Sequence, residues 1–77
     1  MAVVTLNSTT FVQVSSGAAA ALVQFQGGGI VHVAETASPA ANDWIIFGGD
    51  DLIRFPSGPA VFVRAVNPGQ IAVTRPF

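Results

Sequence analysis

The chain is divided into short apolar runs, and this division limits most strongly what it can fold into. Clusters of Gly, Pro, Asn and Ser close the runs, as in "NST" at 7–9, "GGG" at 27–29, "PSGP" at 56–59 and "NPG" at 67–69. Runs of this length suit β-strands and are too short for most amphipathic helices. The sequence therefore predicts an all-β protein, a small antiparallel β-sandwich or barrel of six to seven short strands.

One segment also fits a helix. Residues 18–26 open with four alanines, which are strong helix formers. The segment then alternates Leu22, Gln24 and Gln26 with Val23 and Phe25, a pattern that favours a strand. We expect a strand, and a helix remains the alternative.

The length of 77 residues predicts a single domain over 1–77, in which residues 1–20 could extend as a docking arm. A domain this small is marginally stable unless something reinforces it. The chain has no cysteine, so disulfides are excluded. One histidine and four carboxylates are too few for a structural zinc site, and we expect no metal and no cofactor. Oligomerisation remains as the reinforcement.

The charge content points the same way. Charged residues make up 9% of the chain and hydrophobic residues 51%, whereas ordinary soluble domains carry about 25% charged residues. Such a chain would expose apolar patches as a monomer, so we expect a homo-oligomer, a trimer rather than a dimer. The net charge of −1 and the absence of lysine argue against a nucleic-acid partner. No apolar segment is long enough to span a membrane.

Two sequence features could belong to a catalytic site or to a metal site. His32 is the only histidine, and no nucleophile motif accompanies it, so we predict a structural or surface histidine and no enzyme activity. Asp50 and Asp51 follow Gly48 and Gly49 and could begin a calcium loop. Two adjacent aspartates supply too few oxygens for calcium. We therefore predict a hairpin turn, with glycine at positive φ and aspartate in local hydrogen bonds.

The stretch "DWIIFGGDDLIRF" at 43–55 places bulky residues on both faces of a strand. Trp44 and Ile46 share one face, and Ile45 and Phe47 share the other. One pair is expected to fill the core and the other to contact a second chain, and we assign Trp44 to the contact.

The arginines also suggest an interface. Arg54 and Arg64 lie within apolar strands, where an arginine needs a partner, and Glu35, Asp50 and Asp51 are the available carboxylates. Arginine and aromatic residues are enriched in the cores of interfaces. The predicted interface residues are Trp44, Ile46, Arg54, Phe62, Arg64 and Phe77.

Residues 22–75 resemble the small β-sandwich proteins encoded among the virion genes of tailed bacteriophages. The resemblance rests on "VHVAETASPAANDWIIF", on "IRFPSGPAVFVRAV" and on the final "IAVT". In those proteins a loop rich in Ala and Pro precedes an aromatic strand, and a later strand with an arginine is followed by a glycine turn. The resemblance implies a virion component: a head decoration or fibre-base protein, or a small tail module.

We therefore expect a non-enzymatic structural protein of a phage particle, a capsid decoration or stabilising protein. It would oligomerise and dock on the major capsid protein or another virion protein, after assembly in the host cytoplasm. The alternative is a small tail or fibre module that binds a receptor or carbohydrate. A single Trp and no Tyr argue against that alternative.

Overall fold

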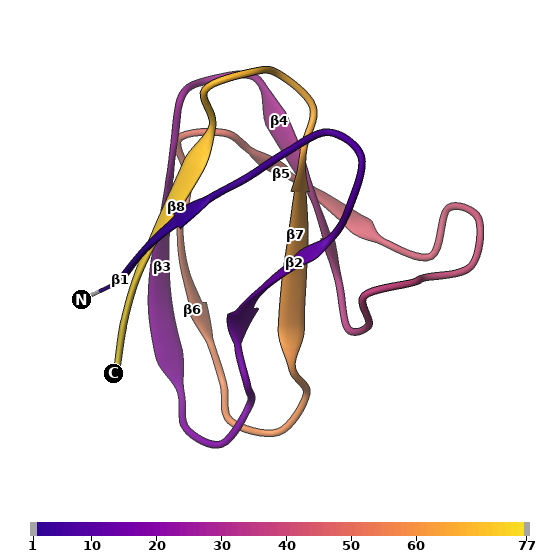
Figure 1. Ribbon diagram of the computed structural model, residues 1–77. Helices are drawn as coiled ribbons and strands as arrows, with labels where there is room; N and C mark the ends of the chain where they lie inside the picture. Colours follow the sequence, from indigo (N-terminus) through magenta and orange to yellow (C-terminus); the bar gives the residue numbers. More distant parts are fainter. Residues whose placement is uncertain (1, 77) are drawn as a thin grey trace.

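A computed structural model describes residues 2–76, which form eight β-strands and two facing sheets (Figure 1). The strands are β1 (Ala2–Thr5), β2 (Val12–Ser15), β3 (Ala21–Gln26), β4 (Ile30–Ala34), β5 (Ile45–Gly48), β6 (Leu52–Phe55), β7 (Val61–Ala65) and β8 (Ile71–Pro76). The all-β sandwich is confirmed. The expected number of six to seven strands is too low, because every apolar run forms a strand of its own.

The order of the strands is that of a jelly roll. The first sheet has the order β1-β8-β3-β6 and the second sheet the order β2-β7-β4-β5. Strand β1 pairs with β8, β2 with β7, β3 with β6 and β4 with β5, all antiparallel. The same pairs would form if the chain folded into one long hairpin, with β1–β4 as one arm and β5–β8 as the other. In a jelly roll this hairpin is wrapped around a core, so successive pairs lie in opposite sheets.

This topology corrects the predicted hairpin at 43–55. Strand β5 pairs with β4 in the second sheet, whereas β6 pairs with β3 in the first. Residues 48–51 therefore carry the chain from one sheet to the other. The apolar runs on either side looked like the two arms of a hairpin because both are edge strands with one face toward the same core.

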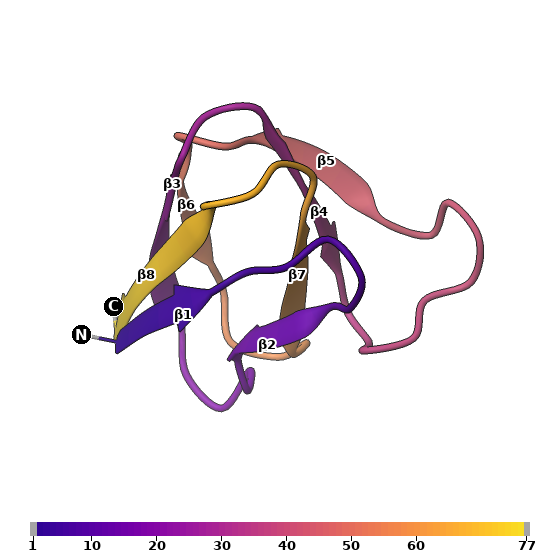
Figure 2. The same cartoon turned by 45° about the horizontal axis from the view of Figure 1, so that its top comes forward.

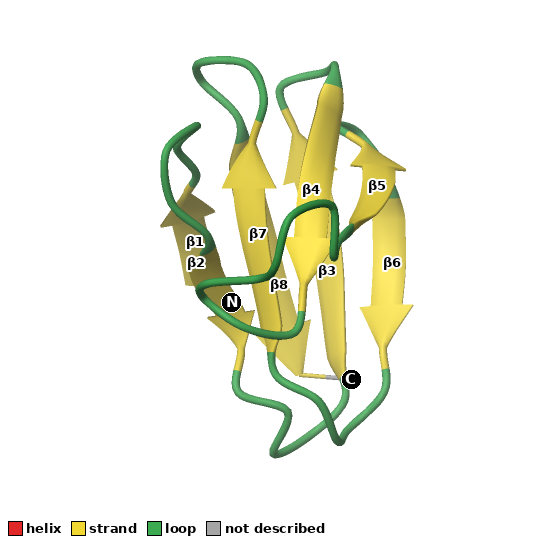
Figure 3. Ribbon diagram, turned by 90° about the vertical axis from the view of Figure 1, so that its right-hand side faces the viewer, coloured by secondary structure: helices red, strands yellow, loops and turns green. Residues whose placement is uncertain are grey.

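The two halves of the chain occupy equivalent places. Replacing β1–β4 by β5–β8, and the reverse, converts the strand order of one sheet into that of the other. The strand order therefore has a near-twofold symmetry. Strands β1 and β2 form one side of the sandwich, and β5 and β6 form the opposite side (Figure 3).

The core lies between the sheets and consists of the inward residues of each strand. Val23, Phe25, Val31 and Val63 are fully buried there. The strict alternation of buried and half-buried residues in β3 and β7 produces this arrangement, since neighbouring side chains of a strand point to opposite faces.

Residues 2–20 are built into the sandwich. They supply β1 and β2, and Leu6 and Val14 belong to the core. The strand expected within 18–26 is confirmed from Ala21 onward, where β3 pairs with both β6 and β8. The preceding alanines lie in the connection from β2.

The side chain of Gln70 joins two connections at one end of the sandwich. Its side chain is fully buried, and its Oε1 accepts hydrogen bonds from the backbone N–H groups of Val66 (2.8 Å) and Asn67 (2.9 Å). Its Nε2 donates to the carbonyl oxygens of Gly28 and Ile30. A single amide therefore satisfies four backbone groups in two different turns.

Gly49 is required for a reason other than the positive φ that we predicted at Gly48 and Gly49. Neither has a positive φ. A Cβ on Gly49 would instead lie 1.9 Å from the carbonyl oxygen of Gly28, so only glycine lets the two turns approach. The local hydrogen bonding is as expected, since Asp51 Oδ2 accepts from the N–H of Gly48 at 2.9 Å.

Candidate functional site

The outer face of the second sheet carries a row of three paired residues. Arg64 of β7 lies opposite His32 of β4, and His32 lies opposite Ile46 of β5. Residues opposite each other in an antiparallel pair point to the same face. The neighbours of Arg64 in β7, Val63 and Ala65, are buried in the core, so this row faces outward.

Two aromatic rings enclose Arg64. The guanidinium carbon lies 4.6 Å from the centre of the Phe11 ring and 4.8 Å from the centre of the Trp44 ring. Trp44 also stacks on His32, with ring centres 5.1 Å apart and planes inclined by 23°. We call Phe11, His32, Trp44 and Arg64 the arginine cluster. Cation–π contacts of this kind contribute on the order of 0.5–2 kcal/mol each.

The protonation state of His32 follows from its partner. Arg64 Nη2 lies 2.9 Å from His32 Nδ1, and arginine can only donate, so Nδ1 accepts and the ring proton is on Nε2. Burial lowers the pKa of His32 below its usual value of 6.5, and the charge of Arg64 lowers it further. His32 is held in the arginine cluster by its contacts with Arg64 and Trp44.

The partner expected for Arg64 was a carboxylate, and this is wrong. Asp50 Oδ1 accepts from the N–H of Gly28 and Asp51 Oδ2 from that of Gly48, so both aspartates serve the turns. Arg64 is held by rings and by the neutral His32 instead. Sequence order gave no indication of this, because Phe11 and Trp44 reach Arg64 only when β2, β7, β4 and β5 lie side by side.

The predicted interface residues divide between the two sheets. Trp44 and Arg64 lie on the outer face of the second sheet, with Ile46 in the same row and Phe62 two residues from Arg64 on β7. Arg54 is exposed on the outer face of the first sheet, opposite Leu22. Phe77 lies outside the described residues.

The side of the sandwich formed by β5 and β6 exposes large apolar residues. Ile45 is 65% exposed, Ile46 58% and Leu52 58%. Strand β5 carries no charged residue and no proline, the features that usually protect an edge strand. The loop between β4 and β5 projects away from the two sheets and returns at the start of β5 (Figure 2).

A cavity of about 340 Å³ opens on this side, between the end of β4, the start of β5 and the end of β6. We call it the edge groove. It is lined by Val33, Ala34, Glu35, Asn42, Asp43, Trp44, Ile45, Phe47, Phe55, Pro59, Ala60 and Val61.

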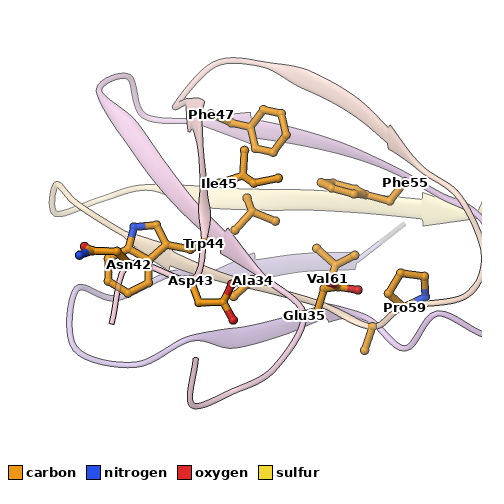
Figure 4. Close-up of a pocket in the computed structure, with 12 residues that line it drawn as sticks. Ala34, Glu35, Asn42, Asp43, Trp44, Ile45, Phe47, Phe55, Pro59 and Val61 are labelled. Carbon is orange, nitrogen blue, oxygen red and sulfur yellow. The ribbon is translucent and has the colours of Figure 1, made fainter. Parts of the chain in front are cut away.

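The edge groove has two chemically different sides. The rings of Phe47 and Phe55 lie on one side, and the carboxylates of Asp43 and Glu35 lie across from them (Figure 4). The two rings meet edge to face, with centres 6.2 Å apart. The sequence analysis did not identify this groove. Glu35 and Asp43 are eight positions apart, and only the return of the loop to β5 brings both to one opening.

Among residues 2–76 there is no group of three or more His, Cys, Asp or Glu side chains placed to hold a metal ion. No helix long and apolar enough to cross a membrane occurs within the same described range.

Comparison of the chain with protein-family models, with curated proteins and with solved structures finds no match.

Proposed function

We propose that this chain is a non-enzymatic structural protein of a phage particle, which self-associates and docks on the major capsid protein or another protein of the virion. The observation that carries the proposal is the exposed apolar side formed by Ile45, Ile46 and Leu52. Ile46 lies on the outer face of the second sheet and Leu52 on that of the first, so the exposed residues surround the edge of the sandwich that β5 and β6 form. Large apolar residues gathered at one edge mark a surface that another chain covers. The proposed location is the virion, after assembly in the host cytoplasm.

The outer face of the second sheet gives this surface a second component. Trp44 and Arg64 are half-buried in the arginine cluster, and Ile46 lies beside them. Residues of these types contribute most of the binding energy at protein interfaces. The cluster is already ordered before any partner arrives, which reduces the entropy lost on docking.

The jelly-roll topology is compatible with the proposed function and with other functions. Viral capsid domains share this topology, and so do lectin domains. The alternative function is therefore a tail or fibre module that binds a receptor or carbohydrate. Sugar binding usually uses an aromatic face open to solvent, whereas Trp44 lies against His32 and Arg64. This contact favours the structural role.

The proposal is tested on purified particles by quantitative mass spectrometry. We expect the chain at a fixed copy number relative to the major capsid protein, retained after a high-salt wash. Ile46→Lys should abolish incorporation while the isolated variant stays folded. Gln26→Lys, an exposed residue on the first sheet, is the matched control and should incorporate normally. Particles without the chain, or an incorporated Ile46→Lys variant, would refute the proposal.

A further inference from the structure

The edge groove combines features that suit one class of ligand. The rings of Phe47 and Phe55 lie on one side, and the carboxylates of Glu35 and Asp43 lie across from them, with Trp44 beside Asp43. No basic residue lines it. A guanidinium or ammonium group on an apolar stem would meet both sides at once, since carboxylates pair with the cation and rings accept it over their faces.

The chain itself supplies such a group. Its basic residues are Arg54, Arg64 and Arg75, and there is no lysine. Arg64 is already enclosed in the arginine cluster. Arg54 precedes Phe55, which lines the groove, so it belongs to the same side of the molecule. Arg75 is exposed near the end of β8, followed by the exposed Pro76.

The near-twofold symmetry places Arg75 away from the groove. In the symmetric strand order, the end of β4 corresponds to the end of β8. The groove lies at the end of β4, and Arg75 lies at the end of β8. Arg75 lies opposite Leu22 of β3 and so points from the outer face of the first sheet, two strands away from the edge strand β6. The acidic groove and Arg75 therefore lie on different surfaces of one molecule.

We propose that the edge groove of one copy receives Arg75 of a second copy, with the guanidinium between Glu35 and Asp43 and its stem against the rings of Phe47 and Phe55. The contact joins two different surfaces, so it is heterologous and continues from copy to copy until the rotation closes a ring. It rests on the self-association in the proposed function and specifies which residues mediate it.

Complementing variants test the contact. Arg75→Glu removes the donor, and the double change Glu35→Gln with Asp43→Asn neutralises the acceptor. Each variant alone should self-associate with a dissociation constant at least about tenfold higher than the wild type, the usual scale for losing a charge pair at an interface. Because each retains one intact half, an equimolar mixture should form heterodimers that grow no further. Sedimentation velocity measures all four samples.

Arg54→Glu is the matched control, since it makes the same charge change at an exposed position on the same sheet. It should assemble like the wild type. Circular dichroism checks that all variants are folded. Trp44 is the only tryptophan and lines the groove, so its emission should change on dilution of the wild type and stay constant for Arg75→Glu.

The outcomes separate this inference from the proposed function. A wild type that assembles while Arg75→Glu assembles equally well overturns the inference alone. So does a mixture that fails to form heterodimers, or an Arg54→Glu variant as impaired as Arg75→Glu. A monomeric wild type overturns the self-association as well. If butylguanidinium still shifts the Trp44 emission of that monomer, the groove serves a basic segment of another protein, and the assignment to a second copy is wrong.

Discussion

At the scale of the single residue, Arg64 shows how a charged side chain is accommodated in an otherwise apolar strand. Its guanidinium lies between the rings of Phe11 and Trp44 and donates to the neutral His32. No second charge needs to be desolvated in this arrangement, which avoids the main cost of a buried ion pair. The arrangement depends on His32 staying unprotonated.

His32 should make stability depend on pH. Its pKa is lowered in the folded protein by burial and by Arg64, whereas in the unfolded chain it is near 6.5. As the pH falls below about 6.5, the unfolded chain binds a proton that the folded protein binds less well, so the unfolding free energy decreases. Above that pH both states are neutral, and this dependence disappears.

Urea denaturation between pH 7.5 and 5 measures the effect. His32→Gln is the control, because glutamine can accept the hydrogen bond from Arg64 and does not titrate. We expect the wild type to lose stability toward pH 5 and the variant to lose less. Parallel pH profiles for the two proteins would contradict the neutral His32.

Gln70 should be the polar residue on which stability depends most. Gln70→Ala leaves two N–H groups and two carbonyl groups without the partner that a fully buried side chain supplies. Each unsatisfied buried group costs about 1–3 kcal/mol, so the total loss should exceed about 3 kcal/mol. Thermal melting compared with Gln26→Ala, an exposed glutamine, measures it. Similar melting temperatures for the two variants would show that water replaces the amide.

At the scale of the elements, the aromatic residues at the two faces of β5 have different surroundings. Phe47 packs against the core and against Phe55, whereas Trp44 packs on the outer face with the arginine cluster. Phe47→Ala should therefore lower the unfolding free energy by about 3 kcal/mol. Trp44→Ala should cost about 1–2 kcal/mol, because it removes cation–π and ring contacts at a half-buried site.

Circular dichroism and incorporation into particles together distinguish these roles. We expect Phe47→Ala to fail in folding, and Trp44→Ala to fold and fail in assembly. If both variants unfold to the same extent, or both still assemble, the two faces of β5 do not have separate roles.

The turn at 48–51 should tolerate change at Asp50. Its Oδ1 accepts one hydrogen bond, from Gly28 at 3.2 Å, and asparagine keeps that acceptor. Asp50→Asn should alter stability by about 0.5 kcal/mol or less. Added calcium should leave the melting temperature of the wild type unchanged. A rise of several degrees with calcium would identify a metal site instead.

The elements were predictable from sequence to different degrees. The alternation in β3 and β7 and the glycine and proline clusters determine strands locally, so these were predicted well. The pairing of β5 with β4 and of β6 with β3 depends on the rolling of the whole chain, which no local pattern in 43–55 reports. The arginine cluster and the edge groove were missed for the same reason. Their residues come from segments that meet only in the finished sandwich.

At the scale of the whole molecule, a domain of 77 residues has a small core, and this one is not reinforced by disulfides. One side of its sandwich exposes Ile45, Ile46 and Leu52 beside an open groove. Burying those side chains against another chain would add about 25 cal/mol for each Å² of apolar surface removed from water. The proposed self-association would therefore add stability to a core of this small size.

The mass of the isolated wild-type chain in solution tests this account most directly. Light scattering at micromolar concentration should give a trimer or a larger closed assembly, since the groove and Arg75 lie on different surfaces and link copies in one direction. The melting temperature should also rise with protein concentration, because assembly stabilises the folded chain by mass action. A monodisperse monomer with a high melting temperature that is independent of concentration would contradict the account.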